Sequence, residues 1–144
     1  TKEINIPIIS MDYYPTLMEL AGITSEKTKA QTVDGKSLLP ALKGVSSKQN
    51  DAIYWHYPHY HEQGGVPYSA VRWKDWKLIE NFQTNTYELY NLENDISETI
   101  NLIDTNQEIA KTLKVMLNEW RDNVDAQYPT PNENFIKEKQ RKKK

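Results

Sequence analysis

The sequence predicts an α+β fold: short helices, then a small antiparallel sheet of three or four strands, then a long C-terminal amphipathic helix that covers the sheet. Two observations predict it. Runs rich in aromatic and β-branched residues alternate with short polar turns over residues 52–92. A stripe of apolar residues with helical spacing follows, over residues 109–124. A sheet of this size needs such a cover on one face to be stable, so the two observations support each other.

Two short helices are predicted before the sheet. The first, over residues 12–21, has one apolar face formed by Tyr14, Leu17, Met18 and Ala21. Asp12 is expected to cap the start of this helix, and Gly22 stands where helices commonly end in a left-handed residue. The second helix is predicted over residues 38–43, with Gly44 after its last residue.

The extended segments of the sheet are predicted at residues 52–57, 68–73, 76–80 and 87–92. Pro58 disfavours a central strand position for the residues after it, so residues 58–67 are expected to form a loop. Lys74 and Asp75 form a two-residue connection, and such turns favour a positive φ that lysine adopts reluctantly. One helical turn is expected over residues 97–102.

The long helix is predicted over residues 106–125. Its apolar stripe consists of Ile109, Leu113, Met116, Leu117, Trp120 and Val124. The chain then runs extended through Pro129 and Pro131. Residues 133–144 end in a block of like charges, which predicts a basic, disordered tail.

Composition excludes several classes of function. The chain has 144 residues, which corresponds to about one domain, and its net charge is −2. This balance predicts no nucleic-acid partner, and no apolar run is long enough to predict a membrane span. The absence of cysteine excludes disulfides and thiolate metal sites. Because the chain does not start with methionine, we expect it to be part of a longer protein.

The candidate site lies just before the strand pair, where His56, His59 and His61 alternate with Tyr57 and Tyr60. Three interpretations are open. The imidazoles can line a substrate cleft and bind a sugar hydroxyl or a sulfate oxygen. They can form a metal site, although their spacing is not that of the strong zinc motifs. The loop can also simply pack its aromatic rings on the edge of the sheet.

Three residues of the strand pair are further candidates. Arg72 can bind an anionic substrate bidentately, or it can be a solvated residue that pairs with an acid such as Asp75. Trp73 and Trp76 flank the turn, where they can stack on a sugar or pack in the core, and core packing is favoured.

Six segments in order resemble one known family: MDYYPTLMELAGI, VDGKSLLPALKG, YWHYPHY, AVRWKDWKLI, ELYNLENDISETINL and LNEWRDNVDAQYPTPN. They resemble the C-terminal part of formylglycine-dependent sulfatases of the alkaline phosphatase superfamily, above all bacterial arylsulfatases and N-acetylgalactosamine-6-sulfatase-like enzymes. One departure is Lys74, where the family pattern usually has glycine. The resemblance implies that residues 1–44 end the large α/β domain and that residues 45–132 form the C-terminal subdomain.

The resemblance also implies the activity. Such enzymes hydrolyse sulfate esters, here expected on a carbohydrate, with a formylglycine nucleophile and a calcium ion that both belong to the N-terminal catalytic domain. That domain is the expected partner, and a periplasmic or secreted location is implied. This chain has no cysteine, and none of its serines begins the formylglycine motif, so no catalytic or metal residue is assigned and the chain alone is predicted to be inactive. His56, His59, His61 and Arg72 are the predicted substrate-binding residues.

Other functions remain open at this stage. The chain can be an independent module that binds sulfated glycan, or a purely structural support for a larger domain. It can also be the C-terminal part of a related phosphodiesterase or phosphonate hydrolase, because the nucleophile that separates these reactions lies outside it.

Overall fold

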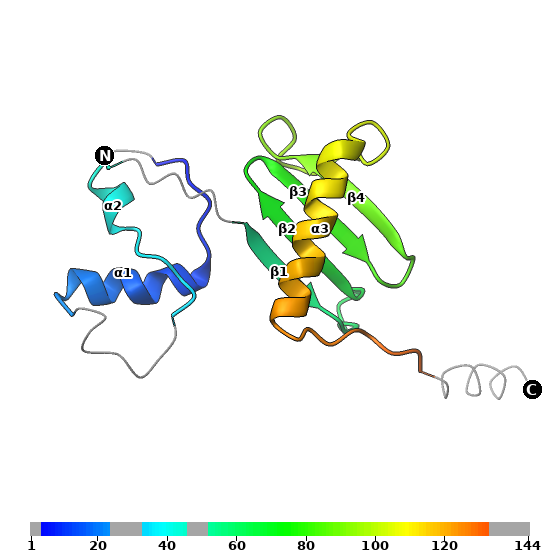
Figure 1. The fold of residues 1–144 in the computed structure, drawn as a ribbon, viewed down its shortest axis with the longest axis horizontal. Coiled ribbons are helices and arrows are strands. Elements are labelled where there is room, and N and C mark those ends of the chain that lie inside the picture. Colours follow the sequence, from blue (N-terminus) through cyan, green and yellow to red (C-terminus); the bar gives the residue numbers. More distant parts are fainter. Residues whose placement is uncertain (1–3, 24–32, 46–51, 133–144) are drawn as a thin grey trace, which may run out of the picture. The chain divides into compact units, whose positions relative to one another are not determined.

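The structure, a computed structural model, describes residues 4–23, 33–45 and 52–132. The chain divides into two compact units, Thr1–Asp51 and Ala52–Lys144. The first unit contains the short helices, and the second contains a sheet with the long helix across it (Figure 1). The predicted α+β class is confirmed.

A buried aspartate organises the first unit. Asp12 ends the 3-10 helix Ser10–Asp12 and occupies the N-cap position of α1, Tyr13–Leu20, but its side chain makes no capping bond to that helix. Its carboxylate instead accepts hydrogen bonds from the backbone amides of Ile9 and Lys36, both at 3.0 Å. Asp12 therefore joins α1 to a segment more than twenty residues later in the sequence.

A threonine makes the second such tie. The Thr16 hydroxyl donates to the carbonyl of Asp12 at 2.6 Å and accepts from the amide of Leu38 at 2.9 Å. Leu38 directly precedes α2, Leu39–Leu42, the second predicted helix. The hydrogen bond between the Thr16 hydroxyl of α1 and the Leu38 amide thus fixes the start of α2.

Gly35 shows how closely these segments approach. A Cβ at this position would lie 2.0 Å from the carbonyl oxygen of Met11, so only glycine fits without a backbone shift. Gly22 ends α1 with a φ of 69°, as predicted.

The sheet of the second unit has four antiparallel strands in the order β1-β2-β3-β4. The strands are β1 Ile53–Tyr57, β2 Tyr68–Trp73, β3 Trp76–Asn81 and β4 Thr86–Asn91. The predicted strands agree with these bounds to within one residue at each end. Lys74, in the turn between β2 and β3, has a φ of 55°, the left-handed conformation for which glycine is usual.

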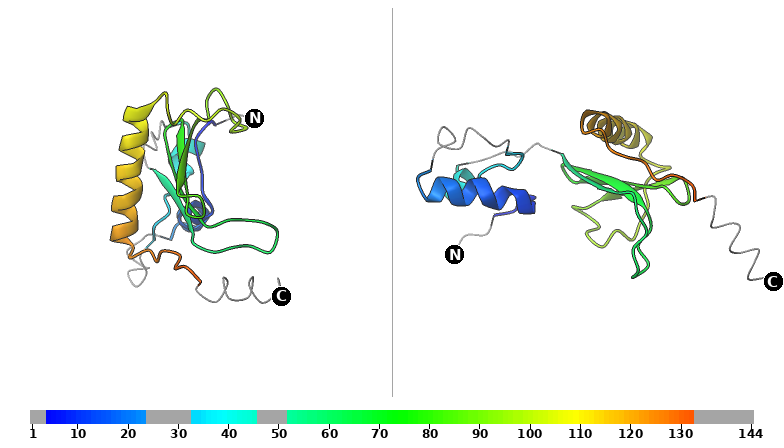
Figure 2. Two further views of the ribbon diagram at one scale, coloured as in Figure 1. Left: turned by 90° about the vertical axis from the view of Figure 1, so that its right-hand side faces the viewer. Right: turned by 90° about the horizontal axis from the view of Figure 1, so that it is seen from below.

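The core lies between one face of the sheet and α3, Gln107–Asn123 (Figure 2). Val71, Leu78 and Leu89 lie directly across from one another on adjacent strands and are fully buried. The helix contributes Ala110, Leu113 and Leu117. Trp73, Trp76 and Trp120 pack around this core, as favoured from the sequence.

Two details of α3 differ from the sequence prediction. Val124, the last member of the predicted stripe, lies beyond the helix and is exposed. The helix instead buries Arg121, a charged residue that no apolar pattern selects. The predicted basic tail, residues 133–144, lies outside the described residues.

The predicted helical turn over residues 97–102 is wrong. The Asp95 carboxylate accepts the amides of Thr99 and Ile100 at 2.8 and 2.9 Å, which holds the chain in a turn, and Glu98 has a φ of 56° that no right-handed helix contains. The same segment protects the edge of β4. The Asn101 side chain accepts the amide of Leu89 at 3.0 Å, and Leu102 donates to the Leu89 carbonyl at 2.7 Å.

Candidate functional site

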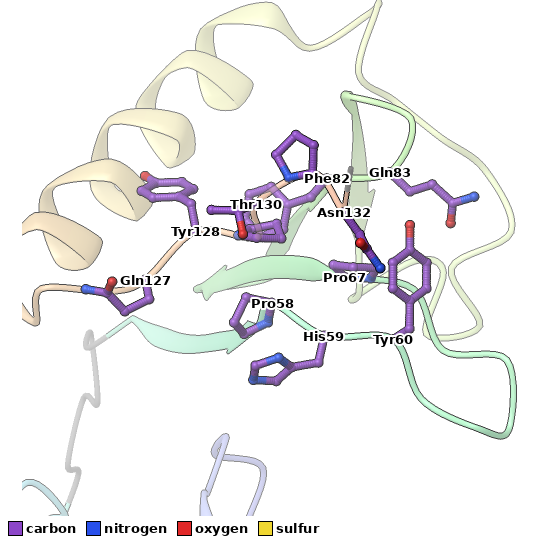
Figure 3. Close-up of a pocket in the computed structure, with 12 residues that line it drawn as sticks. Pro58, His59, Tyr60, Pro67, Phe82, Gln83, Gln127, Tyr128, Thr130 and Asn132 are labelled. Atoms are coloured by element: carbon purple, nitrogen blue, oxygen red, sulfur yellow. The ribbon is translucent and has the colours of Figure 1, made fainter. Parts of the chain in front are cut away.

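A groove of about 980 Å³ lies at one end of the sheet of the second unit. Three segments line it: the loop after β1, the end of β3, and the chain that follows α3 (Figure 3). The lining residues are Pro58, His59, Tyr60, Pro67, Phe82, Gln83, Gln127, Tyr128, Pro129, Thr130, Pro131 and Asn132. Proline, aromatic and amide side chains predominate, and none of these residues is Lys, Arg, Asp or Glu.

The loop wall carries the predicted imidazole. Pro58 ends β1, so His59 and Tyr60 lie in the loop rather than in the sheet, and both are exposed. The His59 ring packs edge-on against Tyr57, with 5.6 Å between the ring centroids. His59 is the one predicted site residue that the structure places on the groove.

His56 has a different position. It lies on β1, on the face of the sheet that packs against α3, directly across from Ser69. Its Nδ1 lies 2.6 Å from the Ser69 hydroxyl, and its Nε2 lies 2.8 Å from the Gln127 carbonyl oxygen. Because a carbonyl only accepts, Nε2 carries the proton. Both nitrogens are therefore occupied within the chain, and His56 connects the sheet to the chain after α3.

An aromatic and cationic cluster lies beside His56. The His56 ring meets Phe82 and Tyr128 edge-on, with centroids 5.9 and 6.3 Å apart. The guanidinium carbon of Arg121 lies 5.0 Å from the centroid of Tyr128 and 5.8 Å from that of Phe82. Such contacts between a cation and aromatic rings stabilise both. Phe82 and Tyr128 also line the groove, so this cluster supports the groove wall from behind.

Arg121 is held by a buried carboxylate. Its Nη1 lies 2.5 Å from Glu80 on β3, and its Nη2 donates to the side chain of Asn118. The other oxygen of Glu80 accepts from the Tyr87 hydroxyl at 2.7 Å. Burial and the hydrogen bond to Glu80 raise the pKa of Tyr87 to about 12. Glu80 and Arg121 thus compensate each other's charge inside the unit.

The other predicted site residues do not line the groove. His61 is exposed in the loop, and its Nδ1 accepts the amide of Gln63 at 3.1 Å. Arg72 lies on β2, half-buried, with its Nε 3.5 Å from the Lys74 carbonyl. Residues 4–23, 33–45 and 52–132 contain no group of three or more metal-ligating side chains, so the metal interpretation of the histidines has no support there.

Sequence reasoning missed the far wall of the groove. Gln127 and Tyr128 follow α3 by only a few residues but are far in sequence from the histidines. The Tyr-Pro-Thr-Pro run was the only available signal, because prolines keep this segment extended and outside α3.

No helix within the described residues is long and apolar enough to cross a lipid bilayer.

The family described as N-sulphoglucosamine sulphohydrolase, C-terminal, matches residues 1–123. A protein named sulfatase from Formosa agariphila is 36% identical across 67% of this chain. A choline-sulfatase from Rhizobium meliloti is 33% identical across 68% of it. The chain spans about a fifth of the length of these relatives, 19% and 18%.

Solved structures agree with the family match. BT4656, solved in complex with its substrate D-glucosamine-2-N,6-O-disulfate, is 25% identical with a TM-score of 0.65, over 82% of this chain and 24% of that one. BT1596, a 2-O GAG sulfatase, is 27% identical with a TM-score of 0.62, over 80% and 25%. A phosphonate monoester hydrolase from Agrobacterium radiobacter shares the fold at 20% identity, with a TM-score of 0.50 over 79% and 24%, so the fold alone does not separate the reactions. This chain belongs to the N-sulphoglucosamine sulphohydrolase C-terminal family and is a C-terminal sulfatase domain of the alkaline phosphatase superfamily.

Proposed function

We propose that this chain is the C-terminal part of an enzyme that hydrolyses sulfate esters on a carbohydrate. The family match over residues 1–123 carries the proposal, because it covers the first compact unit and most of the second. The sugar substrate of BT4656 and the name of BT1596 support a glycan as substrate class. The proposal includes a periplasmic or secreted location for the enzyme, where it would have access to such glycans.

The chemistry itself is assigned to another domain. The chain has no cysteine and no serine in a formylglycine motif, and its described residues contain no cluster of metal ligands. We therefore assign the formylglycine and the calcium ion to an N-terminal catalytic domain. The role of the present chain is to complete a wall of the substrate cleft.

The surface of the first unit supports such a partner. Several large apolar side chains are exposed there: Ile8, Met11, Tyr13, Tyr14, Leu17, Leu20 and Leu42. Apolar surface gathered on so small a unit is typical of a part that packs against a larger domain. The catalytic domain of the same enzyme is the proposed occupant of this surface.

Within the cleft wall we divide the predicted residues by their contacts. His59 is proposed to bind substrate, because it is exposed on the groove and its ring makes no hydrogen bond within the described residues. A substrate contact by His56 would break one of its two internal hydrogen bonds, so His56 is proposed as a positioning residue. His61 and Arg72 are proposed only as secondary contacts, since neither lines the groove.

The test compares the intact enzyme with the isolated chain. The enzyme containing its catalytic domain should release sulfate from sulfated saccharides and act less on a phosphonate monoester of matched size. The isolated chain should show no turnover of an aryl sulfate above the buffer blank. Preferred hydrolysis of the phosphonate, or activity of the chain alone after a second purification, would contradict the proposal.

The contribution of His59 is tested with a matched histidine. His59→Ala in the intact enzyme removes a hydrogen bond to a charged or polar substrate group, so kcat/KM on a sulfated saccharide should fall about tenfold. His61→Ala, in the same loop but off the groove, should change it much less. A small aryl sulfate, which offers no sugar to bind, should respond little to either variant. Equal values for both variants on the saccharide would remove His59 from the cleft.

A further inference from the structure

We propose that the groove between the loop after β1 and the segment 127–132 is a subsite for an uncharged sugar ring of the carbohydrate chain. This deepens the proposed function and rests on it. The groove has a volume of about 980 Å³, near the upper end of the range of roughly 300–1,000 Å³ for small-molecule sites. It has room for more than a single small group, which suits a segment of an oligosaccharide.

The chemistry of the lining selects the ligand class. A sulfate group would be expected to meet arginine or lysine donors, and no such residue lines the groove among those described. Apart from the His59 imidazole, the polar lining consists of uncharged groups, chiefly the amides of Gln83 and Gln127 and the hydroxyl of Thr130. These groups bind sugar hydroxyls, while the aromatic rings of Tyr60 and Tyr128 add apolar surface to the lining.

The far wall is held in place before any ligand arrives. Three contacts fix the chain after α3: the Nε2 of His56 donates to the Gln127 carbonyl at 2.8 Å, Arg121 packs on the Tyr128 ring, and Phe82 meets the same ring at 5.8 Å. Without them this segment would be a free continuation of a helix end. A wall ordered in advance costs less entropy on binding.

The main competing occupant is an extended peptide, because grooves rich in aromatic rings also bind proline-rich segments. The sugar is favoured by the amide and hydroxyl groups on both walls. A peptide is one of the outcomes that the experiment distinguishes.

The experiment titrates the ¹⁵N-labelled 144-residue chain with a desulfated glycosaminoglycan hexasaccharide, its sulfated counterpart and a proline-rich octapeptide. Amide shifts at millimolar saccharide are expected in residues 58–67, 82–83 and 127–132, with the desulfated and sulfated forms binding within about threefold of each other. The absence of shifts, binding of the sulfated form alone, or tighter binding of the peptide would each overturn the subsite.

Two variants test the wall itself. Tyr128→Ala removes a ring that lines the groove and should weaken binding about tenfold. His56→Ala leaves every lining residue intact but frees Gln127, so a similar loss is expected from positioning alone. His56→Gln can still donate to the Gln127 carbonyl and should restore affinity to within about threefold of the parent chain. His61→Ala, in the same loop but off the groove, should weaken binding far less than Tyr128→Ala or His56→Ala.

A spectroscopic readout separates positioning from loss of fold. The ¹⁵N signals of His56 should report the Nε2–H tautomer, and amide shifts of β2 and β3 should stay unchanged in every variant. Unaltered affinity in His56→Ala with an intact sheet would overturn the positioning of the wall. If the chain binds saccharide while the intact enzyme releases no sulfate, the proposed function fails and the subsite stands. If the enzyme releases sulfate but the chain gives no shifts, the subsite alone fails.

Discussion

The two units of this chain are stabilised in different ways. The second unit has a continuous apolar core, with Leu78, Leu89, Leu113 and Leu117 fully buried between sheet and helix. In the described part of the first unit, only Ala41 among the apolar residues is buried, and the other buried side chains are Asp12 and Thr16. The first unit is thus organised by backbone hydrogen bonds to two polar side chains, while its large apolar residues remain exposed.

The difference indicates that the second unit can fold on its own core and that the first needs a covering surface. Hydrogen bonds alone contribute modestly to folding, because the unfolded chain makes equivalent bonds to water. A unit that buries little apolar area gains little from the hydrophobic effect. This comparison predicts opposite responses to substitution in the two units.

The largest effect is expected at the buried ion pair of the second unit. Arg121→Ala leaves the Glu80 carboxylate buried without its cation, which typically costs about 3–5 kcal/mol. The free energy of unfolding from urea denaturation measures this loss. Arg121→Met combined with Glu80→Gln should lose much less, since no buried charge then remains. Equal losses for the single and double variants would show that the charge is hydrated rather than buried.

A pair of leucines compares the two units directly. Leu117 is 0% exposed and Leu17 is 63% exposed. Leu117→Ala should lower the free energy of unfolding by about 2–5 kcal/mol, because it leaves a cavity in the core. Leu17→Ala should change it by less than about 0.5 kcal/mol in the isolated chain. In the intact enzyme Leu17→Ala should cost more if the catalytic domain covers α1, so an equally small effect there would contradict that packing.

The close approach of Gly35 to the Met11 backbone in the first unit is tested by substitution. Gly35→Ala places a Cβ against the Met11 carbonyl, so the loop must move away from the 3-10 helix Ser10–Asp12, at a cost of about 1–3 kcal/mol. The amide signals of the first unit should shift while those of the sheet stay fixed. Asp34→Ala, at the exposed neighbouring position, is the control and should leave both units unchanged. Shifts that spread into β2 and β3 would show that the two units are coupled.

The smallest effect appears only at high pH. The pKa of Tyr87 is raised to about 12 in the folded state from 10.0, so the unfolded chain loses this proton first. Stability from Tyr87 is therefore fully present below pH 10 and falls as pH rises toward 12. Tyr87→Phe should flatten this fall, and tyrosinate absorbance follows the titration. If the free energy of unfolding falls with pH equally steeply in the parent chain and in Tyr87→Phe, groups other than Tyr87 control the pH dependence.

Much of the fold was predictable because each element carries its own local signal. The strands were placed within one residue, since aromatic and β-branched runs are bounded by turns and prolines. The long helix was placed from its stripe. The segment over residues 97–102 was not, because the Asp95 carboxylate competes with helical hydrogen bonds for the same amides.

The candidate site was predictable only in part. Sequence spacing selected His56, His59 and His61 together, and the structure separates them: one on the groove, one holding the far wall, one at the exposed loop. His56 lies in β1, whereas His59 and His61 follow Pro58 in the loop, so residues close together in a motif need not share a site. Whether His56, His59, His61 and Arg72 bind substrate stays a prediction.

The sequence by itself determined the class of fold, the order of the elements and the resemblance to a sulfatase C-terminal domain. Periodicity and local motifs depend only on residues that are close together in the sequence. The tertiary structure decided which residues meet across long separations: Asp12 with Lys36, Glu80 with Arg121, and His56 with Gln127. The last of these contacts closes the groove. Its partners are 71 residues apart, and only the packing of α3 across the sheet brings the chain after this helix back to β1.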